Sequence, residues 1–106
     1  MIDLNDENFG EEVLNKKGLF LVGFWSPMCA ACRNLGWILS NVEKELNGKV
    51  GFGKLNIFET PQIAKRYKIP ATPTIIIFRD GEPIEKAVGL RPEQVLIKKL
   101  NSLINN

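Results

Sequence analysis

Hydrophobic and polar positions along this chain of 106 residues follow two periods, one typical of buried strands and one typical of amphipathic helices. The run LFLVGFW (19–25) follows Gly18 and is apolar throughout, which predicts a strand buried on both faces at the centre of a sheet. Between residues 29 and 47, apolar side chains then recur at helical spacing, and Gly48 supplies a stop. These apolar positions are Leu35, Ile38, Leu39, Val42 and Leu46. The pattern predicts an amphipathic helix directly after the buried strand.

The rest of the chain repeats this alternation of strands and helices. Thr60 and Pro61 offer an N-cap and a first-turn proline, and the Asp-Gly pair in RDGEP (79–83) is typical of a hairpin. Further strands are expected at 1–4, 49–58, 72–78 and 84–89. Further helices are expected at 8–14, 61–68 and 92–105. This order predicts an α/β fold in which a central mixed sheet of about five strands is flanked by about four helices, as a single domain over residues 1–106.

Charge and composition limit the kinds of partner. The chain carries 14 basic and 12 acidic residues, for a net charge of +2, and the basic residues are scattered. This balance does not favour nucleic acid or an anionic membrane as a partner. The first ten residues are acidic and polar, unlike a signal peptide, and no apolar run approaches the roughly 20 residues of a membrane span. We therefore expect a cytoplasmic protein.

Both cysteines of the chain, Cys29 and Cys32, lie at the junction of the buried strand and the long helix. At this spacing the two sulfurs lie side by side, one helical turn apart. The free N–H groups and the dipole at a helix start favour a thiolate on Cys29. In a reducing compartment such a pair is more often catalytic, redox-sensing or metal-binding than a permanent cross-link.

The cysteine pair has three possible interpretations. A zinc or iron–sulfur site would need carboxylates or a second chain, because the sequence has no histidine and no third cysteine. An inert staple is disfavoured, since a helix start is a poor place to hide a thiol. Redox exchange is the favoured interpretation, with Cys29 as the nucleophile and Cys32 as the residue that resolves the mixed disulfide.

Two stretches carry a resemblance to a known family. The stretches VGFWSPMCAACR (22–33) and AKRYKIPATPTIIIFRDGEPIEKAVGL (64–90) resemble the thioredoxin family, and the order of strands and helices agrees along nearly the whole chain. The resemblance implies that Pro73 is cis and lies beside the cysteines. It also implies that Thr72 and Pro73 form a backbone ledge on which an extended substrate segment pairs by strand addition.

The resemblance further implies a small apolar contact surface for oxidised protein targets, built from loops that converge near Cys29. The residues expected there are Trp25, Met28, Ile69, Pro70, Ala71, Val88, Gly89 and Leu90. Each of them has an alternative role in core or loop packing, and Met28 is expected to be exposed because it adjoins the helix start.

The sequence departs from the family pattern at the cysteine motif and beneath it. The usual Trp-Cys-Gly-Pro-Cys becomes MCAAC, so Met28 replaces the aromatic residue and Ala30-Ala31 replaces Gly-Pro. Both alanines are strong helix formers, so the helix is expected to start at the motif. Gly23 stands where the family usually has a buried aspartate that relays a proton, while Lys54 is retained. Without that carboxylate, Lys54 would favour the thiolate and make the disulfide less reducing, unless it is only a solvated strand-end charge.

A third departure lies within the long helix. Gly36 and Trp37 stand where the family usually has a proline kink. Glycine costs ~1 kcal/mol in a helix interior, so Gly36 is expected to permit a close approach or a bend. Trp37 is expected to be partly buried by packing.

The sequence thus predicts a thiol–disulfide oxidoreductase that reduces or exchanges protein disulfides through Cys29 and Cys32. We expect it to act as a monomer, with no bound cofactor and no metal. Its partners would be oxidised protein substrates and, by resemblance, a thioredoxin reductase whose type the sequence does not specify. The alternative is a thioredoxin-fold module that binds a partner protein and whose cysteine pair is dispensable.

Overall fold

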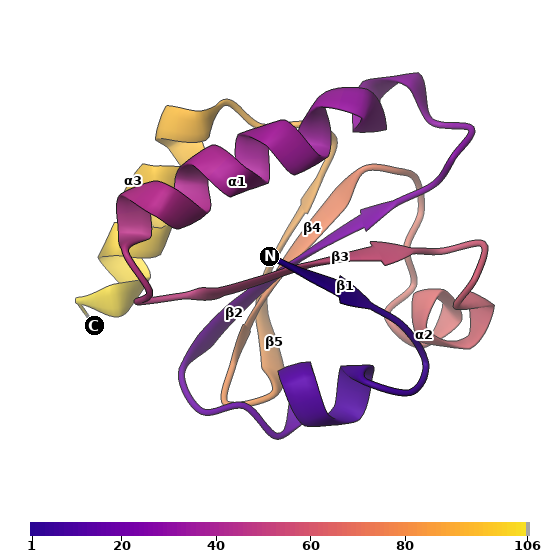
Figure 1. Ribbon diagram of the computed structural model, residues 1–106, viewed down its shortest axis with the longest axis horizontal. Coiled ribbons are helices and arrows are strands. Elements are labelled where there is room, and N and C mark those ends of the chain that lie inside the picture. Colours follow the sequence, from indigo (N-terminus) through magenta and orange to yellow (C-terminus); the bar gives the residue numbers. More distant parts are fainter. Residues whose placement is uncertain (106) are drawn as a thin grey trace.

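A mixed sheet of five strands runs through the molecule in the order β1-β3-β2-β4-β5, as seen in the computed structural model, which describes residues 1–105 (Figure 1). The strands are β1 (Ile2–Leu4), β2 (Leu19–Trp25), β3 (Gly51–Asn56), β4 (Thr74–Arg79) and β5 (Glu82–Val88). The first three in spatial order run parallel, and β4 and β5 each run antiparallel to their inner neighbour. The apolar strand predicted at 19–25 therefore lies at the centre, as expected.

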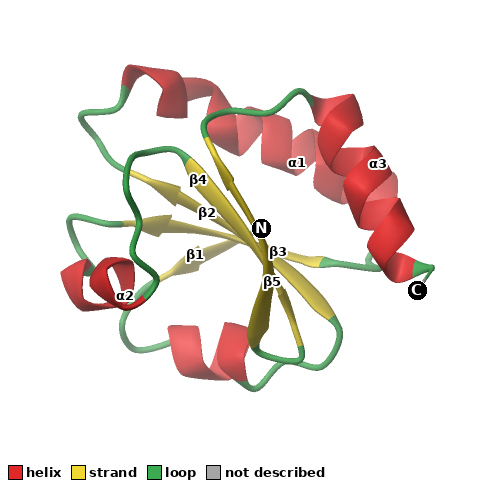
Figure 2. Cartoon of the chain, turned by 180° about the vertical axis from the view of Figure 1, so that it is seen from behind, coloured by secondary structure: helices red, strands yellow, loops and turns green. Residues whose placement is uncertain are grey.

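Helices cover both faces of this sheet. Figure 2 shows α1 (Leu35–Leu46) and α3 (Glu93–Ile104) on one face, while α2 (Pro61–Arg66) and the short π-helix η1 (Gly10–Leu14) lie on the other. A 3-10 turn, η2 (Ala30–Asn34), connects the end of β2 to α1. None of the helices in residues 1–105 is long and apolar enough to cross a membrane.

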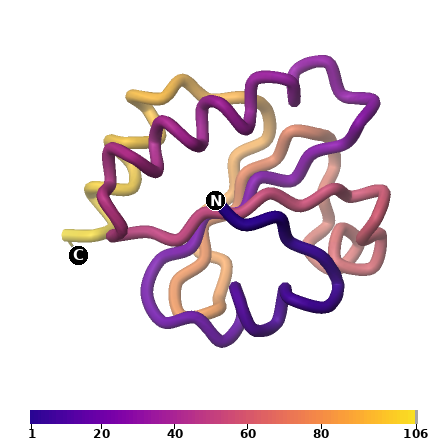
Figure 3. Tube along the Cα trace, viewed as in Figure 1, coloured from indigo at the N-terminus to yellow at the C-terminus, as the bar shows by residue number. Residues whose placement is uncertain are grey.

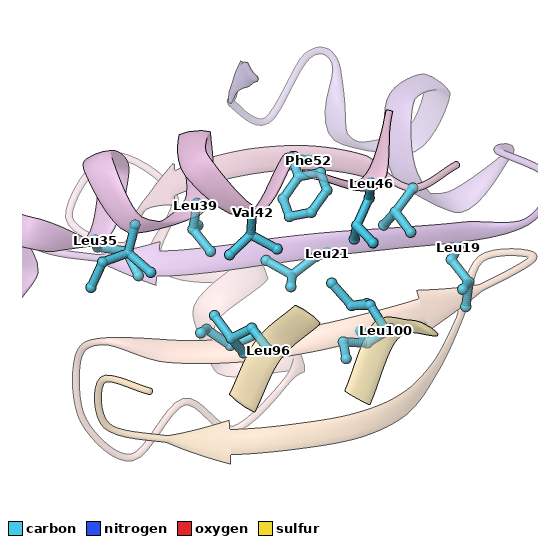
Figure 4. Packing of buried hydrophobic residues seen from close by; sticks show 13 residues of the cluster. Leu19, Leu21, Leu35, Leu39, Val42, Leu46, Phe52, Leu96 and Leu100 are labelled. Carbon is cyan, nitrogen blue, oxygen red and sulfur yellow. The ribbon is translucent and has the colours of Figure 1, made fainter. Parts of the chain in front are cut away.

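The side chains of β2 alternate between two apolar cores. Leu21 points into the core between the sheet and the helices α1 and α3, where Leu39 and Leu100 are also fully buried (Figure 4). Phe20 and Phe24 point into the opposite core, under η1 and α2. A strand with a buried core on each face must be apolar at every position, which explains the run at 19–25.

Several element ends differ from the predicted ones. The long helix starts as the 3-10 turn η2, because Ala30 and Ala31 are exposed and pack against no core, while Cys32 N–H bonds to Cys29 O three residues back. β4 begins after Pro73, which has no N–H to donate to a ladder. β5 begins at residue 82, because Asp80 and Gly81 both have positive φ (51° and 84°) and make a tight hairpin.

Candidate functional site

The two cysteines lie directly beyond the carboxyl end of the central strand. Cys29 is the N-cap residue of η2, and Cys32 lies within this turn. They form a disulfide, with their Cα atoms 5.3 Å apart. The backbone N–H of Cys32 points at Cys29 Sγ, 3.2 Å away, so this sulfur faces a donor that favours negative charge. The pair is thus a half-buried, redox-capable group at the start of a helix.

A second loop meets the sulfur of Cys29. The carbonyl oxygen of Thr72 lies 3.3 Å from Cys29 Sγ, and the Thr72–Pro73 peptide bond is cis, as expected. The hydroxyl groups of Ser26 and Thr72 lie 3.5 Å apart. The loop before β4 is therefore in direct contact with the reactive end of β2.

A third loop completes the site. The backbone N–H of Gly89 donates to the carbonyl oxygen of Pro73 over 2.8 Å. Figure 3 shows the loops after β2, before β4 and after β5 beside one another at the same end of the molecule. The structure thus places Thr72, Pro73 and Gly89 in one chain of contacts that ends at Cys29.

The residues expected on the apolar surface differ in exposure. Met28 is 82% exposed and Val88 is 44% exposed, and Pro70 and Ala71 are also open to solvent. The others are half-buried, and three of these pack against the two cores: Trp25, Ile69 and Leu90. The structure therefore leaves Met28, next to the disulfide, as the most exposed large apolar side chain at the site.

Gly23 lies beneath this site, on the side of β2 that faces α1. A Cβ atom added there would lie 2.8 Å from Cδ1 of Leu39 and 3.1 Å from Cδ2 of Leu35. Both leucines are fully buried. The space that a side chain at position 23 would occupy is therefore filled with leucine methyl groups, and no carboxylate fits without movement of these side chains.

Lys54 of β3 pairs with Gly23 in the sheet register, and its side chain lies between Trp25 and α1. Its Nζ is 5.9 Å from the centroid of the Trp25 ring. The same atom lies 3.4 Å from where a Cβ of Gly36 would stand. The lysine thus lies against α1 at position 36, but at a distance that an added Cβ would tolerate, so this approach does not require the glycine.

The structure corrects the expectation for Trp37. Packing was expected to bury this side chain in part, but it is 65% exposed. The reason is helical geometry: Ile38 and Leu39 face the sheet, which turns position 37 towards solvent.

Two polar residues at the site were not singled out from the sequence. Ser26 is buried beside the hydroxyl group of Thr72, and Arg91 donates from Nη1 to the carbonyl oxygen of Val88 over 2.9 Å. Ser26 acts across loops that are 46 residues apart in sequence, and Arg91 bonds within its own loop, so no recognised motif pointed to either. As for metals, residues 1–105 contain no group of three or more cysteine or acidic side chains placed to hold an ion.

A mixed sheet flanked by helices, with a CxxC disulfide beside a cis-proline loop, is typical of thiol–disulfide exchange proteins. Residues 1–102 match the family model described as Thioredoxin. A thioredoxin of Buchnera aphidicola is 42% identical over 105 residues, covering 99% of this chain and 97% of that protein. A thioredoxin of Rickettsia bellii is 38% identical over 102 residues, covering 96% and 97%, and one of Staphylococcus haemolyticus is 33% identical, covering 95% of each.

The chain belongs to the thioredoxin family. It is a thiol–disulfide oxidoreductase with a CxxC-type site formed by Cys29 and Cys32.

Proposed function

We propose that the protein reduces disulfides of other proteins, with Cys29 as the attacking sulfur and Cys32 as the resolving one. The observation that supports this assignment is the contact between Cys29 Sγ and the Thr72 carbonyl, 3.3 Å apart, in the loop that carries cis-Pro73. A target segment that pairs with the backbone at the half-buried Thr72 would bring its own sulfur to Cys29.

The reaction proceeds in two exchange steps. The Cys29 thiolate attacks one sulfur of the target disulfide, which forms a mixed disulfide and releases the other target sulfur as a thiolate. The Cys32 thiolate then attacks Cys29 Sγ, which forms the Cys29–Cys32 disulfide and releases the second target thiolate. Two electrons pass to the target, whose thiolates take up two protons, and an electron donor must then reduce the protein again.

Contacts with the target are proposed for the exposed parts of the three loops. Thr72, Pro73 and Gly89 would line the contact, although the Pro73 carbonyl is already bonded to the Gly89 N–H, and Met28 and Trp25 would offer apolar surface. Met28 has the most exposed side chain of these and adjoins Cys29, so it is the one expected to touch any bound segment.

Lys54 is proposed to tune the dithiol. Among residues 1–105 the lysine forms no ion pair, and Gly23 supplies no carboxylate beneath it, so its charge is free to favour the thiolate. Stabilising the reduced form makes the couple more oxidising, so we expect a reduction potential above about −270 mV, the value typical of thioredoxin. Equilibration with glutathione measures the potential, and a lower value in the wild type than in Lys54→Gln would contradict this role.

The remaining parts of the proposal concern the setting of the protein. We propose that it acts as a single-domain monomer in the cytoplasm, in electron transport from a thioredoxin reductase whose type is open. The alignment covers 97% of the Buchnera aphidicola protein, and this near-complete overlap supports the single domain. Size-exclusion chromatography tests the monomer, and cell fractionation tests the location.

The test of the main proposal is reduction of insulin disulfides with dithiothreitol as the electron source. We expect turnover by the wild type and none by Cys29→Ser or Cys32→Ser. Cys32→Ser should accumulate a mixed disulfide with the target, whereas Cys29→Ser should not. Trapping by Cys29→Ser instead would reverse the assigned roles, and an inactive wild type would favour a binding module.

A further inference from the structure

The loops at the dithiol carry an uneven set of charges. Three segments meet there: 24–37, 69–74 and 87–92. Their charged residues are Arg33 and Arg91, both cationic, and they contain no carboxylate. A chain with 14 basic and 12 acidic residues thus presents only positive charge on the segments around its reactive sulfurs.

Arg91 is held close to the proposed docking surface. Its Nη1 donates to the carbonyl oxygen of Val88, and the same atom lies 3.4 Å from where a Cβ of Gly89 would stand. Gly89 in turn donates to Pro73 O, next to the Thr72 carbonyl that touches Cys29. The guanidinium group therefore lies beside Gly89, at one end of a chain of contacts that runs through Pro73 and Thr72 to the Cys29 sulfur.

Arg33 flanks the dithiol on the helix side. It follows Cys32 directly and is exposed. Ion pairs within residues 1–105 join the Met1 amino group to Glu43 and Lys99 to Glu85, so neither arginine is paired in that part of the chain. Both guanidinium groups remain available to an incoming carboxylate.

The nearest acidic side chains are directed elsewhere. Glu93, which follows the third segment, accepts a hydrogen bond from Asn41 of α1 over 3.1 Å. Asp3 and Glu59 line a cleft together with Trp25 and Lys54, where the charges are mixed. These carboxylates thus lie outside the three segments, whose only charges are those of the two arginines.

We propose that the protein prefers target segments in which acidic residues flank the disulfide. This inference rests on the proposed function and specifies its substrate class. Arginine pairs with a carboxylate through two parallel N–H donors, and a one-signed patch steers oppositely charged partners during encounter. Met28, which adjoins Cys29 and is 82% exposed, would receive the apolar part of the same segment.

The test compares disulfide peptides that differ only in the residues beside their cysteines. One series carries Asp, one Asn and one Lys at these positions, and hydroxyethyl disulfide serves as a small uncharged substrate that reports thiol reactivity alone. An exposed ion pair contributes about 0.2–1 kcal/mol, so two pairs predict a kcat/KM about two- to thirtyfold higher for the Asp series than for the Asn series. The Lys series should be slower than the Asn series.

Salt and substitution then separate charge from other causes. Raising the ionic strength from about 0.01 M to about 1 M shortens the Debye length from about 30 Å to about 3 Å, so the three series should converge. The double variant Arg33→Gln, Arg91→Gln should lose the preference, while hydroxyethyl disulfide normalises any change in thiol reactivity. The double variant Lys16→Gln, Lys17→Gln, at the opposite end of β2, also removes two charges as a matched control and should keep the preference.

Equal rates for the three series, or a preference that survives the double variant, would overturn the inference. Loss of the preference in the Lys16→Gln, Lys17→Gln double variant would do the same, since it would trace the effect to net charge. Failure of the wild type to reduce hydroxyethyl disulfide and every peptide would instead overturn the proposed function itself.

Discussion

At the scale of single residues, the neighbouring side chains, rather than the backbone conformation, restrict which residue fits at position 23. We expect Gly23→Ala to lower the free energy of unfolding by about 1–3 kcal/mol, because its Cβ would press on methyl groups of Leu39 and Leu35 in a close-packed core. Urea unfolding of the variant measures the loss.

A double-mutant cycle with Leu39→Val provides the control. Shortening Leu39 removes the atom nearest to position 23, so the double variant should lose less than the sum of the two single losses. Strict additivity would show that Leu39 is not the residue that excludes a side chain at position 23.

The site residues differ in the kind of sequence signal that pointed to them. Cys29 and Cys32 followed from local sequence signals, because they lie one turn apart at a helix start and the chain has no histidine or third cysteine to complete a metal site. The roles of Pro73 and Gly89 came only through the resemblance, since their contacts join loops that are distant in sequence. Arg91 was not anticipated for a different reason: its hydrogen bond to Val88 is local, but an isolated arginine after a strand gives no signal of what its guanidinium group will face.

At the scale of elements, the helix α1 carries a glycine in its first turn. We expect Gly36→Ala to raise the free energy of unfolding by about 0.5–1 kcal/mol, because alanine is the better helix former. The new Cβ would meet Lys54 Nζ at 3.4 Å, and this flexible chain end can move aside. Denaturant midpoints measure the gain.

The matched substitution for Gly36→Ala is Ser40→Ala, one turn further along α1, where no glycine is replaced and a smaller gain is expected. A loss of stability in Gly36→Ala would show that Lys54 cannot yield, and that its close approach contributes more than helix propensity.

The ends of elements were harder to predict than the elements themselves. The apolar stripe of α1 was readable because five buried residues share one face. Its start was not, because the exposed Ala30 and Ala31 have high helix propensity but no packing to hold a regular α-helical turn. The fully apolar β2 likewise predicted burial but gave no indication of which side chains face which core.

At the scale of the whole molecule, the order of strands and helices was predictable because each keeps its period. The packing between elements that are distant in sequence was not predictable, and the ring of Tyr67 is an example. This ring lies 5.9 Å from Phe9, 6.4 Å from Phe24 and 5.4 Å from Phe78, measured between centroids. It thereby connects the segments at η1, β2, β4 and α2 in the second core.

The position of Tyr67 predicts a pH dependence of global stability. Burial raises the pKa of its hydroxyl above the ordinary value of 10.0, partly opposed by the nearby Arg66 charge. The unfolded chain therefore loses this proton at lower pH than the folded protein. The stabilisation is fully present below about pH 10 and is lost as the pH rises through the folded pKa.

Tyr67→Phe removes this titration while keeping the ring. We expect the free energy of unfolding of the wild type to fall more steeply above about pH 10 than that of the variant. The difference in slope is at most 2.303RT per pH unit, which corresponds to one proton. Lysines titrate in the same range, but they are common to both proteins and cancel in the difference. Urea unfolding across the alkaline range measures both curves, and parallel curves would show that Tyr67 is not the group responsible.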